Sequence, residues 1–207
     1  MIILKDSKFL TSATNLQGCP PPDMMEVVFL GRSNVGKSTF INTILEKNLA
    51  KSSSTPGKTQ LINFFSVLWE KKAEDSQSIS FRFVDLPGFG YAKVSKGTKK
   101  DWEDNLWNFL NHRSCIKLFV HLVDARHTQL QIDEYVSEII QKLLKPDQRL
   151  LSIYTKFDKL NKNEQHRLYQ KGKLVASNND KIINKNYGGK ERIREMILDG
   201  VLGIERI

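Results

Sequence analysis

The segment from Gly31 to Ser38 has the spacing of a phosphate-binding loop, a glycine followed by four residues and then by Gly-Lys-Ser. Glycine at both fixed positions allows backbone angles and close approaches that a Cβ would block. Successive main-chain N–H groups, and the start of a helix behind them, can then face phosphate oxygens. Lys37 is expected to contact the β- and γ-phosphates, and the Ser38 hydroxyl is expected to ligate Mg²⁺. The simpler alternative is a glycine-rich turn with a surface lysine. The residues expected to bind nucleotide here are Gly31, Arg32, Ser33, Asn34, Val35, Gly36, Lys37 and Ser38.

A second candidate on the phosphate side is Asp85-Leu86-Pro87-Gly88, at the end of an apolar run. Asp85 is expected to support Mg²⁺ through a water molecule, and the N–H of Gly88 can reach a γ-phosphate. Asp-x-x-Gly alone is often a plain turn, but here it follows a P-loop. The next residue is Phe89, where many P-loop GTPases place a glutamine that orients water, so slow intrinsic hydrolysis is predicted. Another residue, a monovalent cation or a partner would supply the missing function.

The tetrapeptide Thr155-Lys156-Phe157-Asp158 ends another apolar run and predicts recognition of guanine. The Asp158 carboxylate can accept hydrogen bonds from N1–H and the 2-amino group, a donor pair that adenine lacks. The aliphatic part of Lys156 can pack along the base. Lys-x-Asp alone is often a solvated surface pair, so the prediction depends on its order after the other two motifs.

The elements that must position these motifs alternate between strand and helix. Strands are predicted at 26–30, 61–68, 79–85, 115–124, 150–154 and 181–183, with helices at 37–46, around 102–110, at 130–144, at 163–178 and from about 189. This alternation predicts an α/β fold of three layers, a mostly parallel six-stranded sheet with helices on both faces. Residues 1–25, with prolines at 20–22, are predicted to be an irregular N-terminal extension, and residues 26–207 a single domain.

The composition is that of an ordinary globular protein with an excess of positive charge. The 207 residues are 40% hydrophobic and 27% charged, and no apolar stretch is long enough to cross a bilayer. Charges at Lys5 and Asp6 argue against a secretion signal. Cys19 and Cys115 have no zinc-ligand spacing and are expected to be reduced thiols. The net charge of +9 favours a polyanionic partner, namely nucleic acid, ribonucleoprotein or an anionic membrane surface, over a generic lysine-rich surface.

Together these motifs resemble the translation-factor class of P-loop GTPases, within its TrmE-Era-EngA-EngB-septin-like group, and most closely the EngB (YsxC/YihA-type) ribosome-biogenesis GTP-binding proteins. The resemblance covers nearly the whole chain, and it is carried by GRSNVGKS (31–38), TPGKTQLINFF (55–65), DLPGFGYAKV (85–94) and TKFD (155–158). It implies a Ras-like G domain, a cytoplasmic monomer that binds GTP or GDP with Mg²⁺, and a GTPase switch in assembly of the large ribosomal subunit. It also implies a requirement for normal bacterial cell division and septation, contact with ribosomal RNA, and no DNA partner.

The resemblance further implies that Thr59 is the switch threonine that reaches Mg²⁺ and the γ-phosphate. Thr59 lies within Gly57-Lys58-Thr59-Gln60-Leu61, all expected to bind GTP, and Thr55 and the serines at 52–54 are rival candidates. Ser38, Thr59 and Asp85 are thus the metal-site residues.

The last guanine-contacting loop corresponds by resemblance to Ile182-Ile183-Asn184, which departs from the family pattern. The competing location is Ala176-Ser177-Asn178, which is predicted to be helical.

In similar GTPases an asparagine at the position of Asn34 allows K⁺ to replace an arginine finger, and a hydrogen bond within the loop is the equal alternative. The catalytic residues implied are Lys37, Thr59 and Asn34. Lysines after Phe89, at 93, 96, 99 and 100, suit contact with RNA phosphates.

Two other functions compete with a ribosome-assembly GTPase. One is another member of the same class, linked to tRNA modification or to membranes, against which the lack of an appended domain speaks. The other is a non-hydrolysing RNA-binding module, against which the intact Lys37, Ser38, Asp85 and Asp158 speak.

Overall fold

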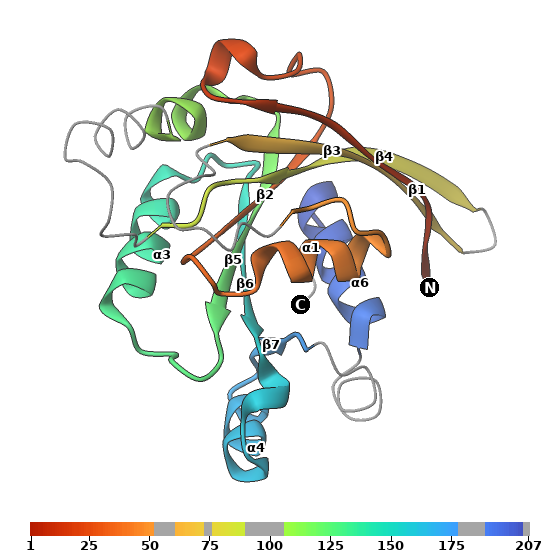
Figure 1. Cartoon of the computed structure of the whole chain (residues 1–207). Helices are drawn as coiled ribbons and strands as arrows, with labels where there is room; N and C mark the ends of the chain where they lie inside the picture. Colours follow the sequence, from red (N-terminus) through yellow and green to blue (C-terminus); the bar gives the residue numbers. More distant parts are fainter. Residues whose placement is uncertain (52–60, 73–75, 90–105, 178–188, 205–207) are drawn as a thin grey trace.

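A computed structural model describes residues 1–51, 61–72, 76–89, 106–177 and 189–204 (Figure 1). Its strands are β1 (Ile2–Ala13), β2 (Glu26–Gly31), β3 (Ile62–Lys71), β4 (Gln77–Asp85), β5 (Ile116–Asp124), β6 (Arg149–Thr155) and β7 (Leu174–Val175). Its helices are α1 (Lys37–Leu45), α3 (Gln131–Leu143), α4 (Lys162–Gln170) and α6 (Gly189–Leu202), with short 3-10 helices η1 (Leu16–Gly18) and η2 (Phe157–Lys159) and a further helical stretch at 106–112.

The strands form one mixed sheet in the order β1-β3-β4-β2-β5-β6-β7. From β4 through β2, β5 and β6 to β7 the pairing is parallel, whereas β1, β3 and β4 pair antiparallel. The three-layer α/β prediction is therefore confirmed, but the described sheet has seven strands instead of six. Its parallel part brings the carboxyl ends of β2, β4, β5 and β6 to one edge, where loops of the site begin.

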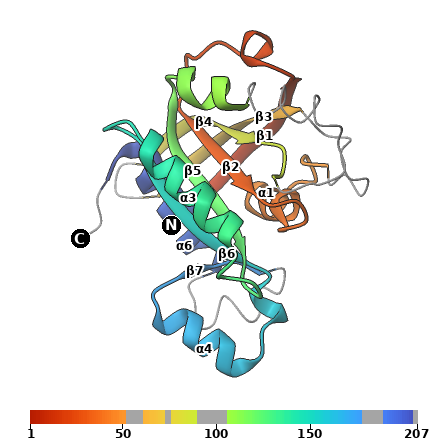
Figure 2. The ribbon, with the colours of Figure 1, turned by 90° about the vertical axis from the view of Figure 1, so that its left-hand side faces the viewer.

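Alternation along β2 divides the core between the two faces of the sheet. Val27 and Phe29 point to one face, which α1 and α6 cover, while Val28 and Leu30 point to the other. The second face is covered by α3 and by the helical stretch at 106–112 (Figures 1 and 2). No helix in the described ranges is both long enough and apolar enough to span a membrane.

The predicted irregular segment at 1–25 is wrong for residues 2–13, which form the edge strand β1 on β3. Burial does not alternate along β1, because the register of its pairing with β3 shifts between Leu4 and Asp6 and again between Phe9 and Thr11. As a result its buried residues are Ile2, Ser7 and Ala13 rather than every second residue. Bulges of this kind are common at sheet edges, where they also hinder pairing with another chain.

The predicted helix at 163–178 is also wrong in its second half, because α4 ends at Gln170. Gly172 follows with φ of 65° and turns the chain back, so that Leu174 and Val175 pair with Ile153 and Tyr154 of β6. The start of α4 is fixed by a capping box between Asn161 and Glu164. The strand predicted at 181–183 lies outside the described residues.

An aromatic cluster holds the antiparallel half of the sheet to its neighbours. The Phe83 ring is fully buried, with ring centroids 4.6 Å from Phe29, 5.6 Å from Phe81 and 5.9 Å from Trp69. Phe9 lies in the same half of the sheet, but it is 49% exposed and its ring contacts Phe65 at 5.8 Å.

Replacing Phe83 with alanine is expected to lower the free energy of unfolding by about 3–5 kcal/mol, because the cavity would be lined by rigid rings. Phe9→Ala removes the same side chain from an exposed position, so its loss should stay below about 1 kcal/mol. Urea-induced unfolding followed by circular dichroism measures both. Equal losses for the two variants would contradict the packing described.

Candidate nucleotide-binding site

The P-loop joins β2 to α1 at the point where β2 lies closest to β5. A Cβ on Gly31 would sit 2.8 Å from the carbonyl oxygen of Leu122, so only glycine fits there. Asn34 and Gly36 have φ of 63° and 98°, and Gly36 is the N-cap of α1. These left-handed residues curl the loop so that α1 begins at Lys37 directly behind it. Such a curled loop could hold an anion through its main-chain N–H groups.

Lys37 and Asp85 form a close ion pair at the mouth of this loop. Asp85 ends β4, and the parallel register that aligns it with Phe29 brings its carboxylate beside the P-loop. The side chains of Lys37 and Asp85 are only 11% and 6% exposed. Little water reaches a charge pair this deeply buried. A phosphate entering here would therefore compete with Asp85 for Lys37, and a cation would compete with Lys37 for Asp85.

The residues around this pair suit Mg²⁺ bound mainly by phosphate and water. The Ser38 hydroxyl lies in the first turn of α1, where it donates to the carbonyl of Lys51 over 3.4 Å. No cluster of three metal-ligating carboxylates, imidazoles or thiols occurs in the part of the chain that the structure describes. Mg²⁺ commonly takes only one or two protein oxygens and completes its shell with waters and substrate phosphates, which the Ser38 hydroxyl and Asp85 carboxylate would allow.

The segment after Asp85 lies directly on the P-loop main chain. The Phe89 N–H donates to the carbonyl of Gly31 over 3.2 Å, and the Ser33 N–H donates to the carbonyl of Phe89 over 3.0 Å. A Cβ on Gly88 would fall 2.9 Å from the main chain of Ser33, so the two loops touch backbone to backbone. The Phe89 ring packs into the core beside His121, with ring centroids 6.1 Å apart. The ring therefore cannot orient a water molecule.

A cavity of about 190 Å³ lies on the other side of the P-loop. Its lining includes Gly36 and Thr39 from the phosphate side, and Lys156, Asp158, Ala176 and Ser177 from the loops after β6 and β7. The Ser177 hydroxyl donates to Asp158 over 2.9 Å. Residues 176 and 177 are not helical, contrary to the prediction, because they directly follow β7. They lie next to the predicted guanine reader.

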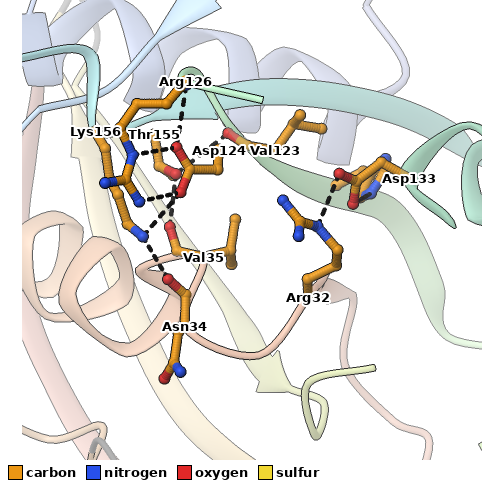
Figure 3. Close-up of polar contacts among 10 residues, drawn as sticks. Arg32, Asn34, Val35, Val123, Asp124, Arg126, Asp133, Thr155 and Lys156 are labelled. Atoms are coloured by element: carbon orange, nitrogen blue, oxygen red, sulfur yellow. Dashed lines mark hydrogen bonds and ion pairs between the residues drawn. The ribbon is translucent and has the colours of Figure 1, made fainter. Parts of the chain in front are cut away.

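The loop after β6 is tied to the P-loop by two side chains (Figure 3). The buried Thr155 hydroxyl donates to the carbonyl of Val35 over 2.6 Å. The Lys156 ammonium donates to the carbonyl of Asn34 over 2.5 Å, whereas the Asn34 side chain points away from this cluster. The P-loop and the lining of this cavity are consequently connected.

Asp124 is a site residue that the sequence analysis missed. It ends β5, and its carboxylate accepts hydrogen bonds from the Arg126 guanidinium and, over 2.9 Å, from Lys156 (Figure 3). Burial raises the pKa of Asp124, but the hydrogen bonds from Arg126 and Lys156 outweigh it and leave the pKa below its ordinary value. These contacts therefore stabilise the fold above about pH 4, and their contribution is lost as the pH falls further. Asp124 lies at the end of an apolar run, and the same kind of position identified Asp85 and Asp158 in the sequence.

Arg32 leaves the P-loop on the opposite side and contacts α3. Its Nε donates to Asp133 over 2.9 Å, and the Asp133 side chain is 4% exposed (Figure 3). The other Asp133 oxygen lies 3.7 Å from Nε2 of His121, which in turn packs beside Phe89. Arg32 was predicted to bind nucleotide, but here its guanidinium connects the P-loop to α3.

The remaining predicted residues fall into three groups. The side chains of Val35, Leu86 and Phe157 are at most 2% exposed, so only their main chains can face a nucleotide. Leu61 directly precedes β3 and is partly buried. Gly57, Lys58, Thr59, Gln60, Ile182, Ile183, Asn184 and the lysines at 93–100 lie outside the described residues.

Comparison with known proteins finds relatives that are described as GTPases or GTP-binding proteins. A family model described as a 50S ribosome-binding GTPase matches residues 26–156. The chain is 56% identical over 205 residues to the "probable GTP-binding protein EngB" of Helicobacter pylori strain J99, with 98% of each chain covered. It is 50% identical over 222 residues to the protein of the same description in Helicobacter hepaticus, with 99% of each covered.

Two solved structures share the fold. The crystal structure of a probable EngB GTP-binding protein matches with a TM-score of 0.54 at 20% identity, covering 86% of this chain and 99% of that one. Aquifex aeolicus Era bound to GDP and aluminium fluoride matches with a TM-score of 0.57 at 18% identity, covering 88% of this chain and 57% of that one.

The Arg32–Asp133 contact predicts that removing the charge of Asp133 destabilises the protein more than removing the charge of the neighbouring Glu134. Asp133→Asn should lower the free energy of unfolding by about 1–3 kcal/mol, because a nearly buried guanidinium contact loses its counter-charge. Glu134→Gln removes a charge from the same first turn of α3 at an exposed position, so it should change stability by less than about 0.5 kcal/mol. Urea unfolding of both variants measures the difference, and matching midpoints would rule out a stabilising ion pair.

Proposed function

The chain belongs to the EngB family of P-loop GTPases, and from this we propose that it is a slow guanine-nucleotide switch acting in assembly of the large ribosomal subunit. GTP hydrolysis follows from the family and the fold. The assignment of individual residues to the nucleotide, the ribosomal partner and a cytoplasmic location are parts of the proposal. A requirement for normal cell division and septation in bacteria is proposed on the family resemblance alone.

The observation that carries the nucleotide part is the position of Lys156. Its ammonium contacts the P-loop carbonyl of Asn34, while Asp158, two residues later, lines the adjacent cavity with Ser177. A nucleotide with its phosphates on the P-loop would therefore have its base beside Asp158. The acceptor pair of that carboxylate matches guanine. Of the two candidate last loops, this geometry supports Ala176-Ser177.

Two contacts give the switch a physical basis. Lys37 pairs with Asp85, and Phe89 is hydrogen-bonded on both sides to the P-loop main chain. A γ-phosphate would draw Lys37 toward itself, leaving the Asp85 carboxylate to Mg²⁺ through water. Contact between the Gly88 N–H and the same phosphate would strain the Phe89 bonds. GTP and GDP would then favour different arrangements of this segment, which is what a nucleotide switch requires.

Slow hydrolysis is proposed because Phe89 occupies the place of a water-orienting glutamine and its ring packs into the core. Mg²⁺ would be held by Ser38 and by Asp85 through water, with Thr59 proposed as the switch ligand. Stimulation of hydrolysis by K⁺ bound beside Asn34 stays a prediction. Equal hydrolysis rates in KCl and in NaCl would contradict it.

A large-subunit partner is supported by the net charge of +9 and by the description of the matching family. Binding should be strongest with a non-hydrolysable GTP analogue, weaker with GDP and weakest without nucleotide. Co-sedimentation of the full chain with purified large subunits measures this order. Equal binding in all three states would overturn the switch, and absence of binding in every state would overturn the partner.

Asp158→Asn is expected to lower the affinity for GTP more than about 100-fold, because the amide offers guanine one donor where it needs an acceptor. The same variant should gain affinity for xanthosine triphosphate, whose C2 carbonyl can accept from that amide. Isothermal titration with both nucleotides, and with ATP as a reference, measures the change. Asp147→Asn, which removes an exposed carboxylate paired with Lys117, is the matched control. If Asp158→Asn binds GTP like the control, the base site lies elsewhere.

A further inference from the structure

α4 projects from the body of the protein beyond the end of β6 and β7 (Figure 2). Of its residues only Leu168 is buried, and Gln165 is half-buried. The helix nevertheless has a defined position, because its start is capped by Asn161 and Glu164. The Gln165 amide also donates to the carbonyls of Phe157 and Leu160, over 3.2 and 3.1 Å. It is therefore an ordered helix with most of its surface in solvent.

That surface is strongly basic. Five cationic side chains between 159 and 173 are exposed, and we call them the α4 basic surface: Lys159, Lys162, Arg167, Lys171 and Lys173. The one carboxylate between them is Glu164, which already accepts a hydrogen bond from the main chain of Asn161. Arg167 and Lys171 are four positions apart, about one helical turn, so they are neighbours at the C-terminal end of α4.

The members of this surface differ in their partners. The Lys159 ammonium lies 3.5 Å from the Asp158 carboxylate, and the Lys173 ammonium lies over the Tyr154 ring. By contrast, the side chains of Lys162, Arg167 and Lys171 have neither an ion pair nor a hydrogen bond to any described residue. Like charges gathered without counter-charges repel one another, so the patch gains free energy when a polyanion covers it.

The chemistry of the neighbouring side chains favours RNA over a membrane or an acidic protein surface. Asn163 and Gln170 place amide donors among the cations, and Tyr169 is 44% exposed. Amides and guanidinium groups suit phosphate oxygens, and an exposed ring suits a splayed base. A helix that docks on lipid needs a broad apolar face, which the outward side of α4 does not have.

We propose that the α4 basic surface binds the phosphate backbone of RNA in the large ribosomal subunit. This inference rests on the proposed function and names the part of the surface that meets the partner. α4 lies in sequence between Asp158 and Ser177, the two residues that meet in the base cavity. Through Gln165 it also contacts the loop that carries Asp158. RNA bound there is next to the part of the site that would sense the base.

The test compares two double variants of the full chain that remove one lysine and one arginine each. Arg167→Gln with Lys171→Gln changes the α4 basic surface, whereas Lys142→Gln with Arg192→Gln changes exposed positions on α3 and α6. Both lower the net charge equally, and neither touches the candidate nucleotide site. Binding to purified large subunits is measured with a GTP analogue at several KCl concentrations, alongside GTP affinity.

The α4 variant should bind large subunits roughly tenfold or more weakly at physiological salt. Its slope of log affinity against log salt should be smaller in magnitude by about 1.4–1.8, the loss expected for two phosphate contacts. The control should match wild type, and all three proteins should bind GTP equally. If wild type binds subunits and both double variants weaken alike, the α4 surface is wrong while the proposed function stands. If wild type does not bind at all, the proposed function itself fails.

Two further probes separate the partner classes. Protein-free large-subunit RNA should show the same loss with the α4 variant. A loss on intact subunits but not on naked RNA would mean that α4 contacts a ribosomal protein, and would overturn the inference. The inference would also be overturned if the α4 variant lost binding only to vesicles of anionic phospholipid.

Discussion

The P-loop main chain is the constraint on which the rest of the site depends. Gly31 fits against the carbonyl of Leu122, Gly88 against the backbone of Ser33, and the Thr155 hydroxyl reaches the carbonyl of Val35. In each case a residue of a neighbouring strand, or of the segment after it, lies against main-chain atoms of the loop, which leaves little room for variation in distance. Because β2 lies between β4 and β5, one short loop fixes the relative positions of segments that are far apart in sequence.

Three compact groups of oppositely charged side chains surround the P-loop. Lys37 faces Asp85, Asp124 faces Arg126 and Lys156, and Arg32 faces Asp133. Each acid is nearly buried, and each has its cation within direct contact, as burial of a carboxylate requires. The Lys37–Asp85 group lies where phosphates and Mg²⁺ are proposed to bind, whereas the other two join loops to their neighbours. Binding and scaffolding are thus divided among chemically similar pairs.

Much of this could be predicted from local sequence. The P-loop, Asp85 and Asp158 follow apolar strands, and the positions of β2 to β6 follow from hydrophobic runs. Asp124 carried the same strand-end signal and was overlooked because no guanine or phosphate motif surrounds it. The Arg32–Asp133 contact joins residues 101 positions apart, so no local pattern could reveal it. β1 was missed because its bulges break the alternation, and the turn at Gly172 shortened a helix that polarity alone would have extended.

The pairing of the first strand with the third has a consequence for biosynthesis. β1 leaves the ribosome before its register partner, which runs from Ile62 to Lys71, so its edge stays open until those residues have emerged. At translation speeds of roughly 5–20 residues per second, this wait is on the order of seconds. During it, Phe9 and Leu10 are flanked by Lys5 and Lys8, charges that discourage nascent chains from associating. The lysines of β1 would thus act in the unfinished chain, before the strand contributes to the finished sheet.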